Sequence, residues 1–148
     1  MLYVLCGIPA SGKTTLSEEL AVKISAKMHR YDDMPNANRR GQHGKVFRDF
    51  CEGIKNDLLD GETVIADGTH ITKRSREILL SYVKDVECKK VVLVMNTPLE
   101  VCIERNRARK NRRSDLCIIV NHKAYEEPSL EDGWDEIKVV ENGEIDFT

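Results

Sequence analysis

The sequence lacks any apolar segment that could cross a membrane. Its longest uninterrupted apolar runs are five or six residues, whereas a bilayer-spanning helix needs about 20. The N-terminus lacks the basic stretch, long apolar core and cleavage site that define a signal peptide. Internal repeats and low-complexity linkers are absent as well. These absences exclude membrane and repeat proteins and predict a soluble, cytoplasmic protein.

Recognisable disulfide and metal patterns are also missing. The five cysteines are odd in number, widely spaced and without a C-x-x-C pair, so we expect reduced thiols and not a zinc site or a disulfide framework. The four histidines lack metal-ligand spacing, and His70 is the strongest functional candidate among them because it follows Asp67.

With 148 residues and 41% hydrophobic content, the chain is expected to form one globular domain spanning residues 1–148. The net charge of −2 gives no general attraction to nucleic acid. The charges are unevenly distributed, however: residues 104–113 carry six cations and one acid, and residues 126–146 carry nine acids against Lys138. A phosphate-rich ligand is therefore compatible with the overall charge.

Apolar runs and helical periodicities alternate along the chain. Strands are expected at 2–6, before Arg30, at 63–66, 91–95 and 136–140, and helices at 13–27, 47–60, after Thr72, after Thr97 and at 115–126. Thr97 and Glu100 are predicted to form a capping box. The alternation predicts an α/β fold, with a doubly wound parallel sheet and helices on both faces.

A glycine-rich loop follows the first predicted strand. Residues 7–14, GIPASGKT, match G-x-x-x-x-G-K-[ST] between a strand and a helix. In that motif, Lys13 reaches the β- and γ-phosphates and Thr14 offers its hydroxyl to Mg²⁺. A plain glycine turn would not need a lysine and a threonine at these positions. We therefore predict an ATP and Mg²⁺ site with these residues against the nucleotide: Gly7, Pro9, Ala10, Ser11, Gly12, Lys13, Thr14 and Thr15.

Carboxylates follow two predicted strands, at the sheet edge where α/β proteins bind ligands. Asp32 and Asp33 follow the second strand, where one of them could activate an acceptor hydroxyl, with Asp33 then contacting the substrate. Asp67 follows residues 63–66 and is predicted to support Mg²⁺ or to orient substrate. The alternative for each acid is a polar turn residue.

The basic segment is predicted to form a small lid over about residues 104–114. Arginine forks match phosphate oxygens, and Arg105 and Arg109 lie four residues apart, on one face if the segment is helical. We therefore predict that Arg105 and Arg109 contact the nucleotide and act in catalysis. The alternative is a set of solvated helix charges.

Four segments together resemble the polynucleotide 5′-hydroxyl kinase family, in particular the bacteriophage-type kinase domain, within the AAA_33 and zeta-toxin-like group of P-loop kinases. They are GIPASGKT, the Asp32–Asp33 pair, IADGTH, and NTPLEVCIERNRAR followed by AYEEPSLEDGWDEI. The resemblance implies a P-loop NTPase-type fold with about five parallel strands, in which Asp32 is the general base and Asp67 lies near the acceptor. Where phage-type members often carry an arginine, this chain has Pro35, so either Arg39 or Arg40 holds the acceptor in its place or the acceptor differs.

The resulting hypothesis is an ATP-dependent phosphotransferase in which Asp32, Lys13, Arg105 and Arg109 are catalytic. The expected acceptor is the 5′-hydroxyl of a DNA or RNA oligonucleotide. One alternative is a kinase for a nucleoside, a nucleotide or another small metabolite, because the same loop, base and lid would serve it. A nucleotide-dependent ATPase or switch is a further alternative, although the guanine-reading pattern N-K-x-D is absent.

Overall fold

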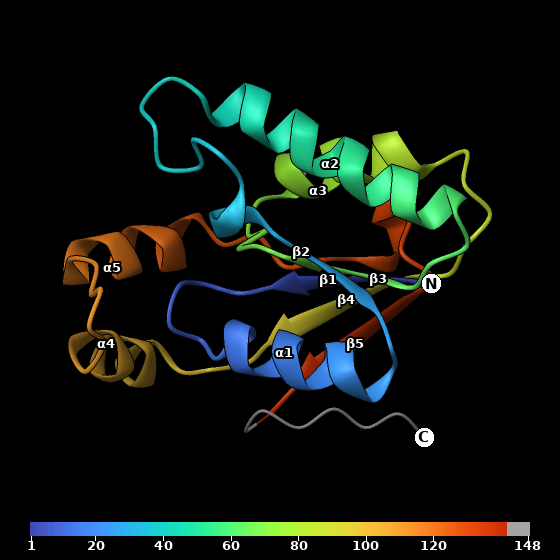
Figure 1. The fold of residues 1–148 in the computed structure, drawn as a ribbon. Coiled ribbons are helices and arrows are strands. Elements are labelled where there is room, and N and C mark those ends of the chain that lie inside the picture. Colours follow the sequence, from blue (N-terminus) through green and yellow to red (C-terminus); the bar gives the residue numbers. More distant parts are fainter. Residues whose placement is uncertain (142–148) are drawn as a thin grey trace.

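A parallel sheet of five strands forms the centre of the computed structural model, which describes residues 1–141 (Figure 1). The strand order is β2-β3-β1-β4-β5, and every neighbouring pair is parallel. This arrangement confirms the predicted fold class. The strands are β1 (Leu2–Cys6), β2 (Lys27–Arg30), β3 (Val64–Asp67), β4 (Lys90–Met95) and β5 (Glu136–Val140).

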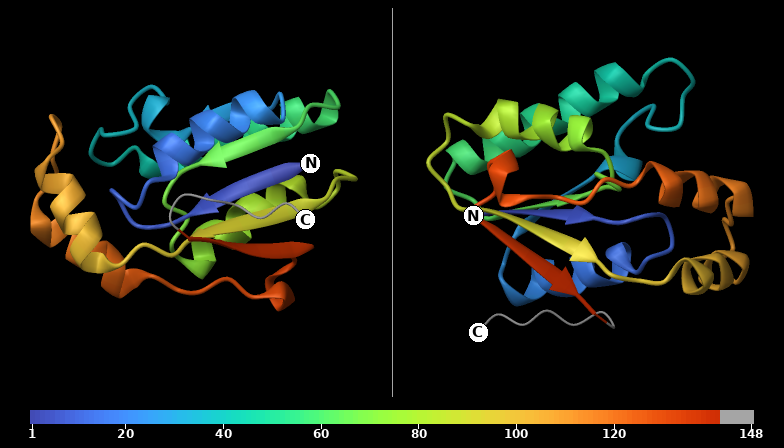
Figure 2. Two further views of the ribbon diagram at one scale, coloured as in Figure 1. Left: turned by 90° about the horizontal axis from the view of Figure 1, so that it is seen from below. Right: turned by 180° about the vertical axis from the view of Figure 1, so that it is seen from behind.

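Helices cover both faces of the sheet. Helix α1 lies on one face and α2 and α3 on the other, while α4 and α5 form a pair beyond the carboxyl ends of the strands (Figures 1 and 2). No helix among residues 1–141 is long and apolar enough to cross a membrane. The helices are α1 (Lys13–Lys23), α2 (His43–Leu59), α3 (Lys73–Val83), α4 (Leu99–Arg107) and α5 (Asp115–Ala124), with short 3₁₀ turns η1 (Tyr31–Asp33) and η2 (Leu130–Asp132).

Alternation along the central strand divides the core into two layers. In β1, Val4 packs in the cluster under α2 and α3, whereas Leu5 packs against α1. All five residues of β1 are buried, as expected for a parallel strand covered on both faces. Trp134 is buried in the layer beneath α2 and α3. A third cluster, containing Ile8 and Ile118, packs α4 and α5 against the glycine-rich loop.

Several helix boundaries differ from the predictions. Helix α1 ends at Lys23 and not at Lys27, because the chain turns through Ser25 at φ +53° and residue 27 opens β2. Helix α2 begins one turn earlier than expected, at His43. Local residues cap two helix ends: Gly61 follows α2 in the left-handed region at φ +83°, and the Thr72 side chain accepts a hydrogen bond from the Ser75 N–H at the start of α3.

The predicted capping box before α4 is wrong. Pro98 is the N-cap of α4, and no side chain caps this helix. Thr97 Oγ1 instead donates to the carbonyl oxygen of Ser11 at 2.8 Å, so the threonine ties the β4–α4 connection to the glycine-rich loop. Helix α5 is capped by Ser114 and ends at Ala124, two residues before the predicted end. The acidic stretch of residues 126–146 continues past residue 141, so it lies partly outside the described residues.

Candidate active site

The loop of residues 7–12 connects β1 to α1 at the carboxyl edge of the sheet. Its path needs left-handed backbone at two positions, Ala10 (φ +66°) and Gly12 (φ +99°). A Cβ on Gly7 would lie 2.8 Å from the Cβ of Met95 and 2.8 Å from Ser11 Oγ, closer than side-chain atoms pack. Glycine is therefore required where the loop passes β4.

Two buried polar groups lie in this loop and directly after it, at Ser11 and Lys13. Ser11 Oγ is buried and has no hydrogen-bond partner among residues 1–141. Burial lowers the pKa of Lys13 to about 8, with Arg109 acting in the same direction and Asp67 and Asp32 opposing it. The Lys13 ammonium donates to the Ile8 carbonyl at 2.9 Å. Because a phosphate in the cavity would compensate the buried charge of Lys13, the loop and the start of α1 fit the phosphates of a nucleotide.

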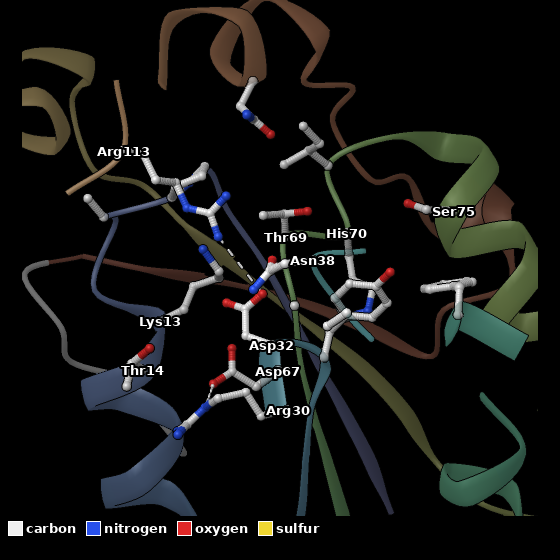
Figure 3. A pocket seen from close by; sticks show the side chains of 18 of the residues that line it. Lys13, Thr14, Arg30, Asp32, Asn38, Asp67, Thr69, His70, Ser75 and Arg113 are labelled. Carbon is white, nitrogen blue, oxygen red and sulfur yellow. Dashed lines mark hydrogen bonds and ion pairs between the residues drawn. The ribbon is translucent and has the colours of Figure 1, made fainter. Parts of the chain in front are cut away.

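Asp67 is the last residue of β3 and is held by two donors. Its Oδ2 accepts from Ser17 Oγ at 2.8 Å and from Arg30 Nε at 3.0 Å. It is only 4% exposed, yet it lines the cavity in front of the loop (Figure 3). Sequence reasoning missed Arg30, although its position at the end of β2, in register with Asp67, places the two side by side.

The two neighbouring aspartates diverge. Asp32 lies in η1, lines the cavity together with Lys13, and has its Oδ1 3.9 Å from Arg113 Nη2. The Asp33 side chain is 72% exposed, lies 3.8 Å from the Arg30 guanidinium, and does not line the cavity. Of the pair, Asp32 is therefore the acid that can face a substrate.

The expected common helical face for Arg105 and Arg109 is not formed, because α4 ends at Arg107. Both side chains nevertheless approach the loop by different routes. Arg105 Nη1 lies 3.4 Å from the position of a Cβ on Gly12, and Arg109 lines the cavity from the turn after α4. The segment 104–114 that the sequence predicts as a lid forms the end of α4 and the turn to α5, and we refer to the α4–α5 pair as the lid. Sequence reasoning missed Arg113, which also lines the cavity.

A cavity of about 420 Å³ lies in front of the loop, within the usual size range of small-ligand sites. One wall is aromatic and was not predicted: Tyr31, His43, Phe47 and His70 line it. Tyr31 and His43 stack with ring centroids 6.4 Å apart. Polar side chains complete the lining, including those of Asn38, Thr69, Ser75 and Asn121 (Figure 3). Arg39 and Arg40 are exposed and do not line this cavity.

His70 is a fixed part of the wall. It is buried, adopts a left-handed backbone at φ +44°, and its Nδ1 lies 2.8 Å from the carbonyl oxygen of Leu5. Burial lowers its pKa to about 4, so the ring is neutral at physiological pH. A Cβ on Gly68 would lie 2.9 Å from His70 Cε1, which explains the glycine there. His70 therefore shapes the cavity and carries no charge into it.

Residues 1–141 contain no cluster of three or more His, Cys, Asp or Glu side chains that could hold a metal by themselves. Thr14 and Asp67 both line the cavity beside Lys13. A hydroxyl and a carboxylate next to bound phosphates are the ligand types that suit Mg²⁺, which takes part of its coordination from the phosphates.

Together, the sheet order, the glycine-rich loop and the arginine-bearing α4–α5 pair define a P-loop kinase fold. A family model described as AAA domain (AAA_33) matches residues 2–117, which is more than half of the chain. The chain belongs to this family.

Among curated proteins, the chain is 23% identical over 159 aligned residues to the L-seryl-tRNA(Sec) kinase of Methanococcus maripaludis. The alignment covers 99% of this chain but 62% of that relative, so the chain spans less than two thirds of its length.

Solved structures share the fold at low identity. A sugar kinase from Janibacter sp. HTCC2649 has a TM-score of 0.74 at 18% identity, covering 94% of this chain and 83% of its own. Chaetomium thermophilum Kti12 in complex with ADP-AlF3 has a TM-score of 0.73 at 21% identity, covering 95% and 88%. A fungal RNA kinase has a TM-score of 0.69 at 15% identity, covering 95% of this chain and 38% of its own.

Proposed function

We propose that the protein transfers the γ-phosphoryl group of ATP to a hydroxyl group of a small acceptor molecule bound in the cavity. The observation that carries this proposal is the position of Lys13 and Asp32 in one 420 Å³ cavity, with the aromatic wall beside them. A cavity of this size holds an acceptor the size of a metabolite together with the transferred group.

In this proposal, the loop and Lys13 hold the β- and γ-phosphates, and Arg105 and Arg109 stabilise their charge. Asp32 accepts the proton of the acceptor hydroxyl, whose oxygen forms a bond to the γ-phosphorus. The bond between that phosphorus and the β–γ bridging oxygen breaks, and its electron pair leaves with ADP. Mg²⁺, held by Thr14 and Asp67, would offset the charge on the phosphates.

The wall residues and polar groups would select the acceptor. Tyr31, Phe47 and His70 offer ring faces, while Asn38 and Ser75 offer hydrogen-bonding side chains. The placement of Asp32 directly after Tyr31 in η1 sets the proton acceptor next to that wall. This arrangement supports an acceptor with an apolar or planar part and a nearby hydroxyl.

The 5′-hydroxyl end of an oligonucleotide is the second candidate acceptor. The observation that favours it is the exposure of Arg39 and Arg40 on the η1–α2 connection, next to the cavity-lining Asn38. In this position the two arginines could contact phosphates of a chain that extends out of the cavity. One structural neighbour is an RNA kinase, which is consistent with a nucleic-acid acceptor.

A panel of acceptors tests the proposal. Transfer from γ-³²P-labelled ATP would be measured with sugars and sugar acids, nucleosides, mononucleotides, and DNA and RNA oligonucleotides bearing a 5′-hydroxyl. We expect a labelled small-molecule product, and we expect Asp32→Asn to lower the rate by at least ~10²-fold while ATP still binds. Asp33→Asn is the matched control, because Asp33 lies outside the cavity.

Three outcomes contradict parts of the proposal. Labelling of oligonucleotides alone would replace the small acceptor by the second candidate. Release of inorganic phosphate with no labelled acceptor would reject the kinase assignment in favour of a nucleotide hydrolase. An unchanged rate in Asp32→Asn would remove the aspartate from the role of proton acceptor.

A further inference from the structure

The arginines at the end of α4 and in the turn to α5 point in different directions. Arg107 Nη2 lies 2.7 Å from Asp115 Oδ2, and Arg112 Nη2 lies 3.6 Å from Asp115 Oδ1. Neither of these two arginines lines the cavity. Arg113, the next residue, turns the other way: it lines the cavity and has its Nη2 3.9 Å from Asp32 Oδ1. Two neighbouring arginines of equal charge therefore face different partners.

A buried asparagine fixes the backbone from which the Arg113 side chain extends. Asn106 is fully buried, its Nδ2 donates to the Arg113 carbonyl at 2.7 Å, and its Oδ1 accepts from the Arg113 N–H at 3.0 Å. The Asn106 carbonyl also accepts from the Arg109 N–H at 3.1 Å. A buried amide is unfavourable unless its polar atoms are bonded. Here both bond the backbone of one arginine and fix its place relative to α4.

The stability of the fold does not account for this arrangement. The Arg113 and Asp32 side chains are 45% and 63% exposed, and ion pairs this exposed contribute little to folding. The pair does, however, span the cavity, since Asp32 comes from η1 and Arg113 from the lid. In Figure 3, the side chains of Lys13, Asp32 and Arg113 point toward one another. A phosphoryl group passing from nucleotide to acceptor would lie among them.

We propose that Arg113 is a third catalytic arginine of the lid, which contacts the transferring phosphoryl group, and that Asn106 is its positioning residue. This inference rests on the proposed phosphotransfer. The guanidinium fork would donate to the oxygens of the transferring group as their charge spreads. Arg113 would also hold the Asp32 carboxylate in the cavity before the acceptor arrives.

The test compares ground-state and transition-state affinity without any acceptor. Fluorescent MANT-ADP with Mg²⁺ is titrated with and without aluminium fluoride, which mimics the transferring phosphoryl group. We expect Arg113→Ala to bind MANT-ADP within about 2-fold of the wild type and to lose ~10²-fold in affinity for the fluoroaluminate complex. Arg112→Ala, the matched control, should behave as the wild type. Arg113→Lys should recover part of the loss.

Asn106 is tested through the same titration. Asn106→Asp keeps the acceptor for the Arg113 N–H but loses the donor to its carbonyl. We expect a loss of ~10-fold or more confined to the fluoroaluminate complex. Melting temperatures of the Arg112 and Arg113 variants should match that of the wild type, because both arginines are exposed.

Three results would overturn the inference. Arg113→Ala could keep wild-type affinity for the fluoroaluminate complex, or Arg112→Ala could lose as much affinity for it as Arg113→Ala. The third is that aluminium fluoride does not change the affinity of the wild type for MANT-ADP. The acceptor panel is independent of this titration. If no acceptor in the panel becomes labelled while Arg113→Ala still loses affinity for the fluoroaluminate complex, the proposed acceptor class is rejected and the role of Arg113 is retained.

Discussion

The ammonium of Lys13 is buried in the fold and is proposed to hold the phosphates through its charge. Replacing Lys13 by methionine tests how burial changes its pKa and how that change affects stability. The pKa of Lys13 falls from 10.5 in the unfolded chain to about 8 in the nucleotide-free fold, chiefly because of burial. The unfolded chain thus binds more protons between these two pH values, so the lysine makes the free energy of unfolding increase with pH in this window. Below pH 8 both states are protonated and the full cost of the buried charge is present.

The magnitude follows from the two pKa values. At about 1.4 kcal/mol for each pKa unit, the largest effect is about 3 kcal/mol, and contact with the open cavity reduces it to ~1–3 kcal/mol. Lys13→Met has nearly the same length and no titrating group. The difference in unfolding free energy between wild type and Lys13→Met should therefore shift by this amount in favour of the wild type between pH 7.5 and 10.5.

Urea denaturation at a series of pH values, without nucleotide, measures this difference. Titrating groups that do not interact with Lys13 are common to both proteins and cancel. Lys45→Met, which removes an exposed lysine of α2, is the control and should show a constant difference from the wild type. A Lys13→Met difference that stays constant within about 0.5 kcal/mol across the range would refute a burial-depressed Lys13.

The same lysine predicts how nucleotide binding depends on pH. Phosphates raise the pKa of a neighbouring ammonium, so ATP binding near or above pH 8 should take up a proton. Calorimetry in two buffers with different ionisation enthalpies measures this uptake. ATP affinity should fall as the pH rises through about 8, and an affinity that is flat from pH 7 to 9.5 would contradict the mechanism.

Three further substitutions test the packing around the site. Gly7→Ala places a methyl group 2.8 Å from Met95 Cβ. We expect a loss of ~1–3 kcal/mol in unfolding free energy together with weaker ATP binding. A wild-type melting curve would contradict this, because it would mean that β4 moves to accommodate the methyl group without a loss of stability. Thr97→Val removes the 2.8 Å hydrogen bond to the Ser11 carbonyl and should lower the unfolding free energy by ~0.5–1.5 kcal/mol in a denaturant titration. An unchanged unfolding free energy would mean that this hydrogen bond does not stabilise the fold. Arg76 is 1% exposed and donates to the carbonyls of His70 and Glu126. Arg76→Met should therefore lower the unfolding free energy by ~2–4 kcal/mol, and Arg76→Lys should lower it less. Equal losses in the two variants would argue against a stabilising role of the two hydrogen bonds.

The parts of the site that could be predicted from sequence are those set by local chain chemistry. The loop of residues 7–14 is such a case, because its glycines, lysine and threonine are adjacent in the chain and their roles depend on backbone within one turn. Asp67 was likewise located by its position after an apolar run. Its partner Arg30 was missed, because only the pairing of β2 with β3 brings the two residues into register.

The lid shows the limit of periodicity. Arg105 and Arg109 have helical spacing, but α4 ends between them because Asn106 turns the chain toward Arg113. That asparagine is an ordinary polar residue in the sequence, and its burial and its two bonds exist only when α4 and the turn have packed. The direction of Arg113 toward Asp32, against the outward direction of Arg112, has no local signal either.

The sequence by itself determined the parallel α/β fold and the glycine-rich loop between β1 and α1, because strand and helix periodicity and the loop motif are short-range properties. The tertiary structure decided which side chains share the cavity. Tyr31, Phe47 and Arg113 are far apart in the chain, yet they line one space because parallel strands deliver η1, α2 and the lid to the same sheet edge. Residue types alone cannot state this convergence, because it depends on strand order and on how the lid packs.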